Sequence, residues 1–171
     1  SIPGKTSEKI LEKPSTPYPQ NQVTKSNYIV ESCIQNSSGE EGFVVKSPDG
    51  MKYTFNQIKT YDSGVNRESW VPIQKYTKLI MANRIEDKFG NWINYNYNTR
   101  GDLESITASD GRQIAIAYES YVGPTGTTLY RADYAEANGK RWDYVYSTVQ
   151  NPVYKKNMLA EVKLPDNSSW K

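Results

Sequence analysis

From about residue 28 to residue 171, short runs of β-branched and aromatic residues alternate with polar segments that contain Gly, Asn or Asp. Such runs are typical of β-strands, and the intervening residues are typical of hairpin turns. The pattern predicts strands over residues 28–34, 42–46, 52–55, 79–85, 91–97, 103–108, 112–118, 128–134, 141–146 and 159–164. We therefore expect an all-β fold, either a curved antiparallel sheet or a two-layer sandwich of β-hairpins.

In three of these runs, every second residue is apolar or aromatic. Side chains on a strand point to opposite faces in turn, so alternate residues share a face. Trp142 falls on one of these stripes, and the three stripes end in Tyr97, Tyr118 and Tyr146. The predicted core consists of Ile93, Tyr95, Tyr97, Ile106, Ile114, Ile116, Tyr118, Tyr144 and Tyr146.

The first 27 residues have a different composition. Four prolines lie among polar residues, and Ile10 and Leu11 form the single adjacent aliphatic pair. Proline-containing polar segments of this kind are typical of linkers. The sequence therefore predicts a polar tether over residues 1–27 and a β domain over residues 28–171.

Turn dipeptides precede several predicted strands. Asp, Asn and Gly tolerate the positive φ angles of tight hairpin turns. We expect a two-residue chain reversal at each of Asp49-Gly50, Asp110-Gly111 and Asn138-Gly139.

Residues 84–107 contain a longer motif that resembles the YD repeats of the Rhs family. In that family a Gly-Asn or Asp-Gly turn, a strand ending Tyr-x-Tyr-Asp, a Gly-containing turn and a Leu-x-x-Ile or Leu-x-x-Val strand follow one another. Asn98 stands where the family usually has Asp, and Asn is also able to cap a turn. The other places are occupied by Gly90, Asn91, Tyr95, Tyr97, Gly101, Leu103 and Ile106.

The resemblance is strongest over residues 79–118 and weaker over 42–62 and 137–171. The turn glycines are unevenly spaced, with 111 − 90 = 21 residues between one pair and 139 − 111 = 28 between the next. We therefore interpret the chain as a set of degenerate repeats with a loop insertion.

The resemblance implies an antiparallel sheet that, in large Rhs and toxin-complex proteins, forms a shell around a toxic polypeptide. This chain is much shorter than such shells. For this chain the resemblance implies a non-catalytic structural or binding module of a secreted, cell-surface or periplasmic protein. Its expected partner is another protein, either paired with a sheet edge or enclosed as a polypeptide.

Composition excludes several other classes. The 21 basic and 19 acidic residues are scattered along the chain, so we expect no nucleic-acid partner. No apolar run approaches the ~20 residues of a membrane span. The absence of His removes imidazole-based catalysis and imidazole metal ligands. The single Cys33 is expected to be a small buried apolar residue.

Tryptophan offers the main candidates for a ligand site. Among Trp70, Trp92, Trp142 and Trp170, Trp92 is predicted to share a strand face with Asn94 and Asn96. An exposed indole stacks on sugar rings, and amides hydrogen-bond to hydroxyl groups. The alternative function is therefore a carbohydrate-binding module for cell-surface glycan, with Trp92, Asn94, Asn96 and Trp142 as candidate ligand-binding residues. The competing interpretation is that Trp92 packs beneath a second sheet layer.

Two sets of oxygen-bearing side chains are candidates for chemical sites. A glycosidase-like pair of carboxylates is conceivable among Asp87, Glu104, Asp110 and Glu119, but their positions in turns and on outward strand faces are explained by capping and solvation. A calcium site is conceivable at Asp62, Ser63, Gly64, Asn66 and Glu68, but the spacing matches no complete calcium loop. We expect no catalytic residue, no metal and no cofactor.

Overall fold

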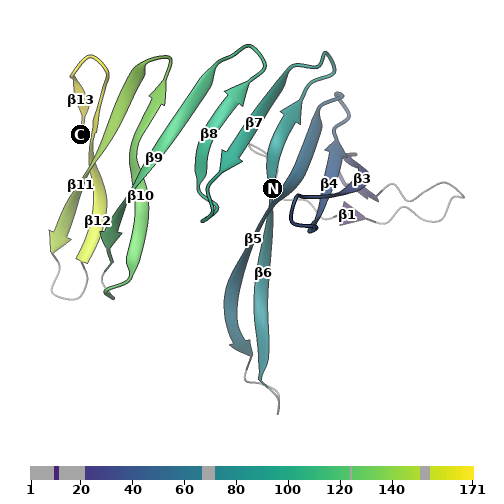
Figure 1. Cartoon of the computed structure of the whole chain (residues 1–171), viewed down its shortest axis with the longest axis horizontal. Coiled ribbons are helices and arrows are strands. Elements are labelled where there is room, and N and C mark those ends of the chain that lie inside the picture. The colour runs from purple at the N-terminus through teal and green to yellow at the C-terminus, as the bar shows by residue number, and fades with distance from the viewer. Residues whose placement is uncertain (1–9, 12–21, 67–71, 124, 151–154) are drawn as a thin grey trace, which may run out of the picture. The chain divides into compact units, whose positions relative to one another are not determined.

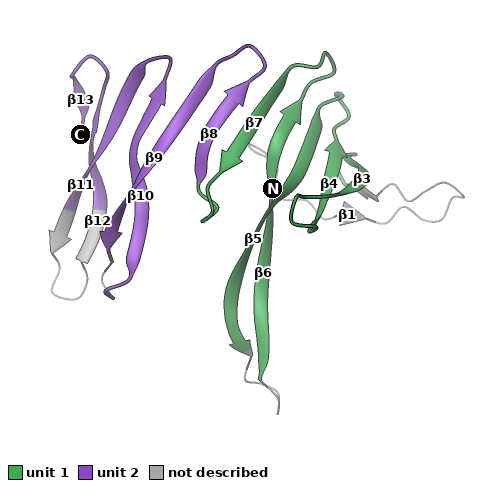
Figure 2. Ribbon diagram, in the orientation of Figure 1, with its two compact units in different colours: residues 1–102 green, residues 103–171 purple. Residues whose placement is uncertain are grey.

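The computed structural model describes residues 10–11, 22–66, 72–123, 125–150 and 155–171 (Figure 1). Every regular element in this described part is a β-strand, so the prediction of an all-β fold is confirmed. The described residues include no helix of the length and apolar character that would cross a membrane. The chain divides into two compact units, unit 1 (residues 1–102) and unit 2 (residues 103–171), which are described separately (Figure 2).

Within each unit, strands that are neighbours in the chain pair antiparallel. Unit 1 contains β1 (Ile10–Leu11), β2 (Gln22–Thr24), β3 (Ile29–Gln35), β4 (Glu41–Lys46), β5 (Lys52–Asn66), β6 (Ile73–Glu86) and β7 (Trp92–Tyr97). Unit 2 contains β8 (Leu103–Ala108), β9 (Gln113–Val122), β10 (Thr128–Ala137), β11 (Lys140–Gln150), β12 (Lys155–Lys163) and β13 (Ser169–Trp170). All ten predicted strands are present. Each unit is an open antiparallel sheet, which is the first of the two expected architectures.

The buried core lies in unit 1. It is formed by Val45, Tyr53, Phe55 and Ala82, and the Phe55 ring stacks on Phe43 with 4.9 Å between centroids. These core residues lie on β4, β5 and β6, in the region where the four strands β3, β4, β5 and β6 pair side by side.

The predicted core was therefore misplaced. None of its nine residues is among the buried residues, and Ile93 and Ile114 are 39% and 40% exposed. An open sheet leaves an apolar stripe half-covered where no second layer lies over it, and strand alternation alone does not reveal this difference.

The N-terminal segment is partly strand. β1 pairs with β2, and β2 pairs with β3 at Ile29 and Val30, whereas the other residues before Gln22 lie outside the described part of the chain. The boundary at residue 27 remains a prediction. Cys33, which was expected to be buried, is exposed. The reason is that β2 covers β3 only at Ile29 and Val30, and Cys33 lies on the uncovered part of β3.

β-Bulges interrupt several of the strand pairs. At a bulge, two residues of one strand lie opposite a single residue of its partner. Side chains beyond the bulge then point to the opposite face from the one that strict alternation predicts. Sequence periodicity does not reveal these interruptions. The extra residues include Glu31 in β3, Asn83 in β6, Asp133 in β10 and Ala160 in β12.

Two glycines are predicted to resist substitution for different reasons. Gly90 has φ +88° and open space where a Cβ would lie, so Gly90→Ala is expected to cost about 1 kcal/mol from backbone conformation alone. A Cβ on Gly42 would lie 2.2 Å from the Phe55 carbonyl oxygen, so Gly42→Ala must displace backbone and is expected to cost roughly 2–3 kcal/mol. Chemical denaturation measures both. Gly90→Asn, which tolerates positive φ, should lose less than Gly90→Ala; an equal loss would contradict the conformational explanation.

Candidate functional site

Eight hairpin turns in the described residues share one backbone geometry. In each, the first residue donates its N–H to the carbonyl four residues later, and the fourth residue donates its N–H back to the carbonyl of the first. The fourth residue always has positive φ, and it is glycine in six turns and Asn27 or Asn167 in the others. These bonds and the left-handed last residue are those of the three-residue hairpin loop.

The predicted two-residue reversal is present at Asn138-Gly139, where both φ angles are positive, at 52° and 71°. It was wrong for Asp49-Gly50 and Asp110-Gly111, which are the last two residues of three-residue loops. The physical reason is that this loop needs positive φ only at its last residue, which glycine supplies, whereas the two-residue turn needs it at both positions.

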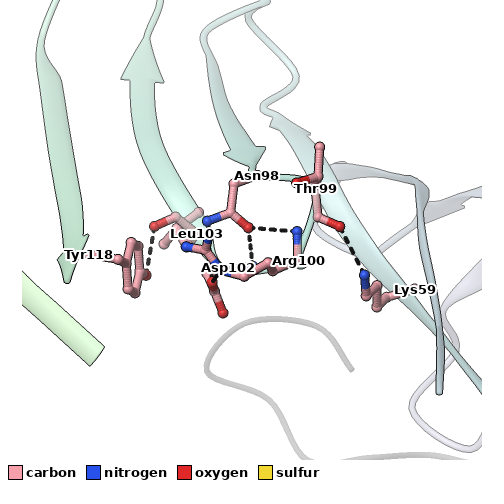
Figure 3. Close-up of polar contacts among 7 residues, drawn as sticks. All are labelled: Lys59, Asn98, Thr99, Arg100, Asp102, Leu103 and Tyr118. Carbon is pink, nitrogen blue, oxygen red and sulfur yellow. Dashed lines mark hydrogen bonds and ion pairs between the residues drawn. The ribbon is translucent and has the colours of Figure 1, made fainter. Parts of the chain in front are cut away.

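Polar side chains at the turns satisfy the loop backbone. Figure 3 shows the turn after β7, where Asn98 Oδ1 accepts hydrogen bonds from the N–H groups of Arg100 and Asp102 at 2.9 and 3.0 Å. The expectation that Asn98 caps this turn is confirmed. In the same turn the Thr99 carbonyl accepts a bond from Lys59 Nζ at 2.8 Å, which ties β5 to the end of β7 (Figure 3).

The carboxylates suggested as catalytic candidates lie in structural environments. The Asn91 side-chain amide, with main-chain N–H groups of the same turn, lowers the pKa of Asp87 below its ordinary value. The main-chain N–H and then the guanidinium of Arg112 lower the pKa of Asp110. A general acid needs the opposite shift. Glu119 accepts a hydrogen bond from Arg131 Nε at 2.7 Å, and Glu104 is exposed on β8.

The calcium candidate is similarly occupied. Asp62 Oδ1 accepts the Gly64 N–H at 2.7 Å and also the side-chain amide of Gln74. Glu68 lies outside the described residues. Among the residues that are described, no three acidic or sulfur-bearing side chains cluster as a metal site would require.

Three tyrosines bridge pairs of neighbouring strands. The hydroxyl of Tyr97 donates to the Ala82 carbonyl at 2.9 Å, that of Tyr118 to Leu103 at 2.9 Å, and that of Tyr146 to Ala132 at 2.7 Å. Figure 3 includes the second of these bonds. The tyrosines are the ones that end the three predicted stripes, so the same bond recurs at three hairpins.

The spacing of these bonds follows from the turns. The first two span 97 − 82 = 15 and 118 − 103 = 15 residues, and the third spans 146 − 132 = 14. The third crosses the two-residue turn at Asn138-Gly139, which is one residue shorter than the three-residue loops crossed by the others.

The bridges begin where the strand ladders end. The β6–β7 register covers only residues 84–86, opposite Trp92, Ile93 and Asn94, and β10–β11 covers only residues 134–137. Ala82 and Ala132 each precede a bulge residue, Asn83 and Asp133. Each hydroxyl therefore donates to a carbonyl that lies beyond the last paired residues of the two strands it bridges.

Trp92, Asn94 and Asn96 lie along β7 as predicted, and Arg84 of β6 joins them. The Arg84 guanidinium lies 4.8 Å from the Trp92 ring centroid, donates to Asn94 Oδ1 at 3.2 Å and forms an ion pair with Glu86 at 2.9 Å. Trp92 is half-buried and Asn96 is exposed. One face of the indole is thus covered by a cation–π contact. Sequence reasoning missed Arg84 because its position depends on the β6–β7 register.

Trp142 belongs to a large surface of unit 2. Cross-strand partners point to the same face of a sheet, and the register pairs Ile106 with Ile114, Trp142 with Ala135, and Trp170 with Val162. We name this surface the apolar face of unit 2; it comprises Ile106, Ile114, Ile116, Tyr118, Ala135, Trp142, Tyr144, Tyr146, Leu159, Val162 and Trp170. Leu159 and Trp170, which are 52% and 67% exposed, were not predicted as part of it. The bulge at Ala160 hides Leu159 from strict alternation.

Loss of a tyrosine bridge should destabilise the protein. Tyr146→Phe leaves the part-buried Ala132 carbonyl without its donor and is expected to lower the free energy of unfolding by roughly 1–2 kcal/mol. Tyr144→Phe, two residues away on the same strand, is the matched control and should change stability by less. Urea denaturation of both variants measures the difference, and equal effects would count against the bridge.

Alkaline pH should weaken the same bridges. Burial raises the pKa of Tyr97 and of Tyr146, so in the unfolded chain these groups ionise first, at about pH 10. The stability they contribute is present below that pH and is lost as pH rises through the raised folded-state pKa. The unfolding free energy should fall with pH above about 10, and less steeply in Tyr97→Phe than in the wild type. Equal slopes in the two proteins would refute the prediction.

Comparison with known proteins adds no relative: no family model, no curated protein and no solved structure matches the chain. The resemblance to YD repeats therefore rests on the sequence motifs alone.

Proposed function

We propose that this chain is a non-catalytic structural or binding module of the Rhs/YD-repeat type, belonging to a secreted or cell-surface protein, and that it presents or helps to enclose a polypeptide. The observation that supports this best is the apolar face of unit 2. Ile114, Leu159 and Trp170 are 40%, 52% and 67% exposed on it. Large contiguous apolar patches are rare on monomeric proteins and mark interaction surfaces.

The chemistry of this face suits a polypeptide partner. It carries isoleucine and leucine beside aromatic rings and spans cross-strand partners from β8 to β13. Apolar side chains of a bound chain would remove this area from water, which is the main favourable term in association. Tyrosine and tryptophan are also among the residues that most often dominate binding energy at protein interfaces.

The other interactions of the described residues support a scaffold. Turn polar groups are satisfied by neighbouring side chains, as at Asn98 and Asp87, and the tyrosine bridges hold adjacent strands where their ladder ends. Two of the carboxylates suggested for catalysis cap turns and a third is ion-paired. These interactions stabilise a repeated surface and leave those side chains committed to structural roles.

A binding assay with a charged substitution on this face tests the proposal. The probe is a reduced and alkylated unfolded polypeptide carrying a fluorophore, titrated with the full chain. Ile114→Lys should weaken its binding roughly tenfold, equivalent to about 1.4 kcal/mol, because a lysine charge would be desolvated in the interface. Gln113→Lys is the control, since Gln113 is the exposed neighbour on the opposite face of β9. Absence of binding, or equal weakening by both substitutions, would contradict the proposal.

A glycan-binding module is the second candidate, supported by Trp92 lying beside Asn94 and the exposed Asn96. One ring face of Trp92 is already covered by Arg84. A panel of soluble glycans, monitored by tryptophan fluorescence in the wild type and in Trp92→Ala, separates the two candidates. Glycan binding that is lost in Trp92→Ala would favour the carbohydrate module over the polypeptide scaffold.

A further inference from the structure

The outer halves of β5 and β6 form a two-stranded arm, which we define as residues 57–66 and 73–81. β4 pairs with β5 only at residues 52–55, and β7 pairs with β6 only at residues 84–86. Beyond these points, the described strands of the arm pair only with each other. Figures 1 and 2 show the arm extending past its neighbours within unit 1. Isolated two-stranded hairpins are marginally stable, so the arm gains from a further strand.

Large apolar side chains of the arm are exposed. Ile73, Tyr76 and Leu79 of β6 are 54%, 64% and 47% exposed. Ile73 and Leu79 share one face of the ribbon and Tyr76 lies on the other, because alternate residues point to opposite faces. A strand added beside β6 would cover parts of all three.

The two edges of the arm differ. On β5 the register shifts between Asp62 and Val65, where Gly64 has φ +84°, so this edge carries a bulge. Bulges protect an edge strand against pairing with other chains. The residues of β6 from Ile73 to Met81 contain no extra residue, so this edge offers an uninterrupted row of backbone groups.

The charge of the β6 edge selects the partner. Residues 73–81 contain Lys75 and Lys78 and no acidic residue. Lys78 lies 3.9 Å from Glu40, but both side chains are largely exposed and such a pair is weak. Pairing of two β6 edges from two copies would bring four lysines onto adjacent strands, which is unfavourable. An acidic strand instead complements both lysines.

We propose that the β6 edge from Ile73 to Met81 binds an extended acidic peptide segment of another protein by strand addition. Main-chain hydrogen bonds to this edge would supply affinity, and Asp or Glu side chains opposite Lys75 and Lys78 would supply specificity. Apolar residues of the peptide would lie beside Ile73, Tyr76 and Leu79. This surface belongs to unit 1, and the inference does not rest on the apolar face of unit 2.

The test uses the full chain and the synthetic peptide Val-Glu-Thr-Val-Glu-Thr-Val. Paired antiparallel with β6, this peptide places a glutamate opposite each of Lys75 and Lys78, which lie on opposite faces of the strand. Its valines then lie opposite Ile73, Tyr76 and Leu79. Binding is followed by the amide NMR signals of the isotope-labelled protein. Signals from residues 73–81 should shift and saturate, while signals of the apolar face of unit 2 should stay unchanged. The same peptide N-methylated at the amides that face β6 should no longer bind, because it has lost its main-chain donors, and a peptide with lysine in place of both glutamates should not bind.

Variants of the protein separate binding that depends on the charge of the arm from nonspecific binding of the peptide. The double variant Lys75→Glu, Lys78→Glu should bind the acidic peptide roughly tenfold more weakly. The control Lys25→Glu, Lys140→Glu makes the same change in net charge at exposed lysines outside the arm and should bind as the wild type does. The inference is overturned if signals of residues 73–81 do not shift, if N-methylation has no effect, if both double variants bind alike, or if the arm instead pairs with a second copy in sedimentation experiments.

Discussion

A hydrogen bond from a tyrosine hydroxyl to a main-chain carbonyl joins strands where their own ladder has ended. At Tyr97 and Tyr146 the acceptor directly precedes a bulge residue, so a break in strand pairing and the bond that spans it occur together. The hydroxyl of each tyrosine satisfies a part-buried carbonyl. The hairpins bridged by Tyr97, Tyr118 and Tyr146 therefore share a turn, a short ladder and a tyrosine bond.

This arrangement explains why the protein carries so much half-covered apolar surface. Short ladders and bulges let successive hairpins diverge, and an open sheet does not cover its own faces. Only around Val45, Tyr53 and Phe55 do neighbouring strands of unit 1 enclose a compact cluster among the described residues. In unit 2 the stripes ending in Tyr118 and Tyr146 remain partly exposed. A polypeptide bound as proposed above would cover this surface.

Much of the fold could be predicted from local sequence signals. Alternation located the ten strands, and the predicted stripes end in the three tyrosines that make the bridges, although the sequence assigned these tyrosines to a buried core. What sequence could not supply was information that depends on register: the bulge at Ala160 that brings Leu159 onto the apolar face, the contact of Arg84 with Trp92, and the exposure of Cys33 beyond the reach of β2. Asp49-Gly50 was assigned to the wrong turn because a dipeptide does not report loop length.

The most direct test of the tyrosine bridges is NMR observation of tyrosine hydroxyl protons in the folded chain. Hydrogen-bonded, part-buried hydroxyls exchange slowly with water, so those of Tyr97, Tyr118 and Tyr146 should give resolved signals close in space to the strands of Ala82, Leu103 and Ala132. The hydroxyl of Tyr76, which is 64% exposed, should exchange too fast to be seen. If all four hydroxyls exchange equally fast, the bridges do not hold the repeats together and the account fails.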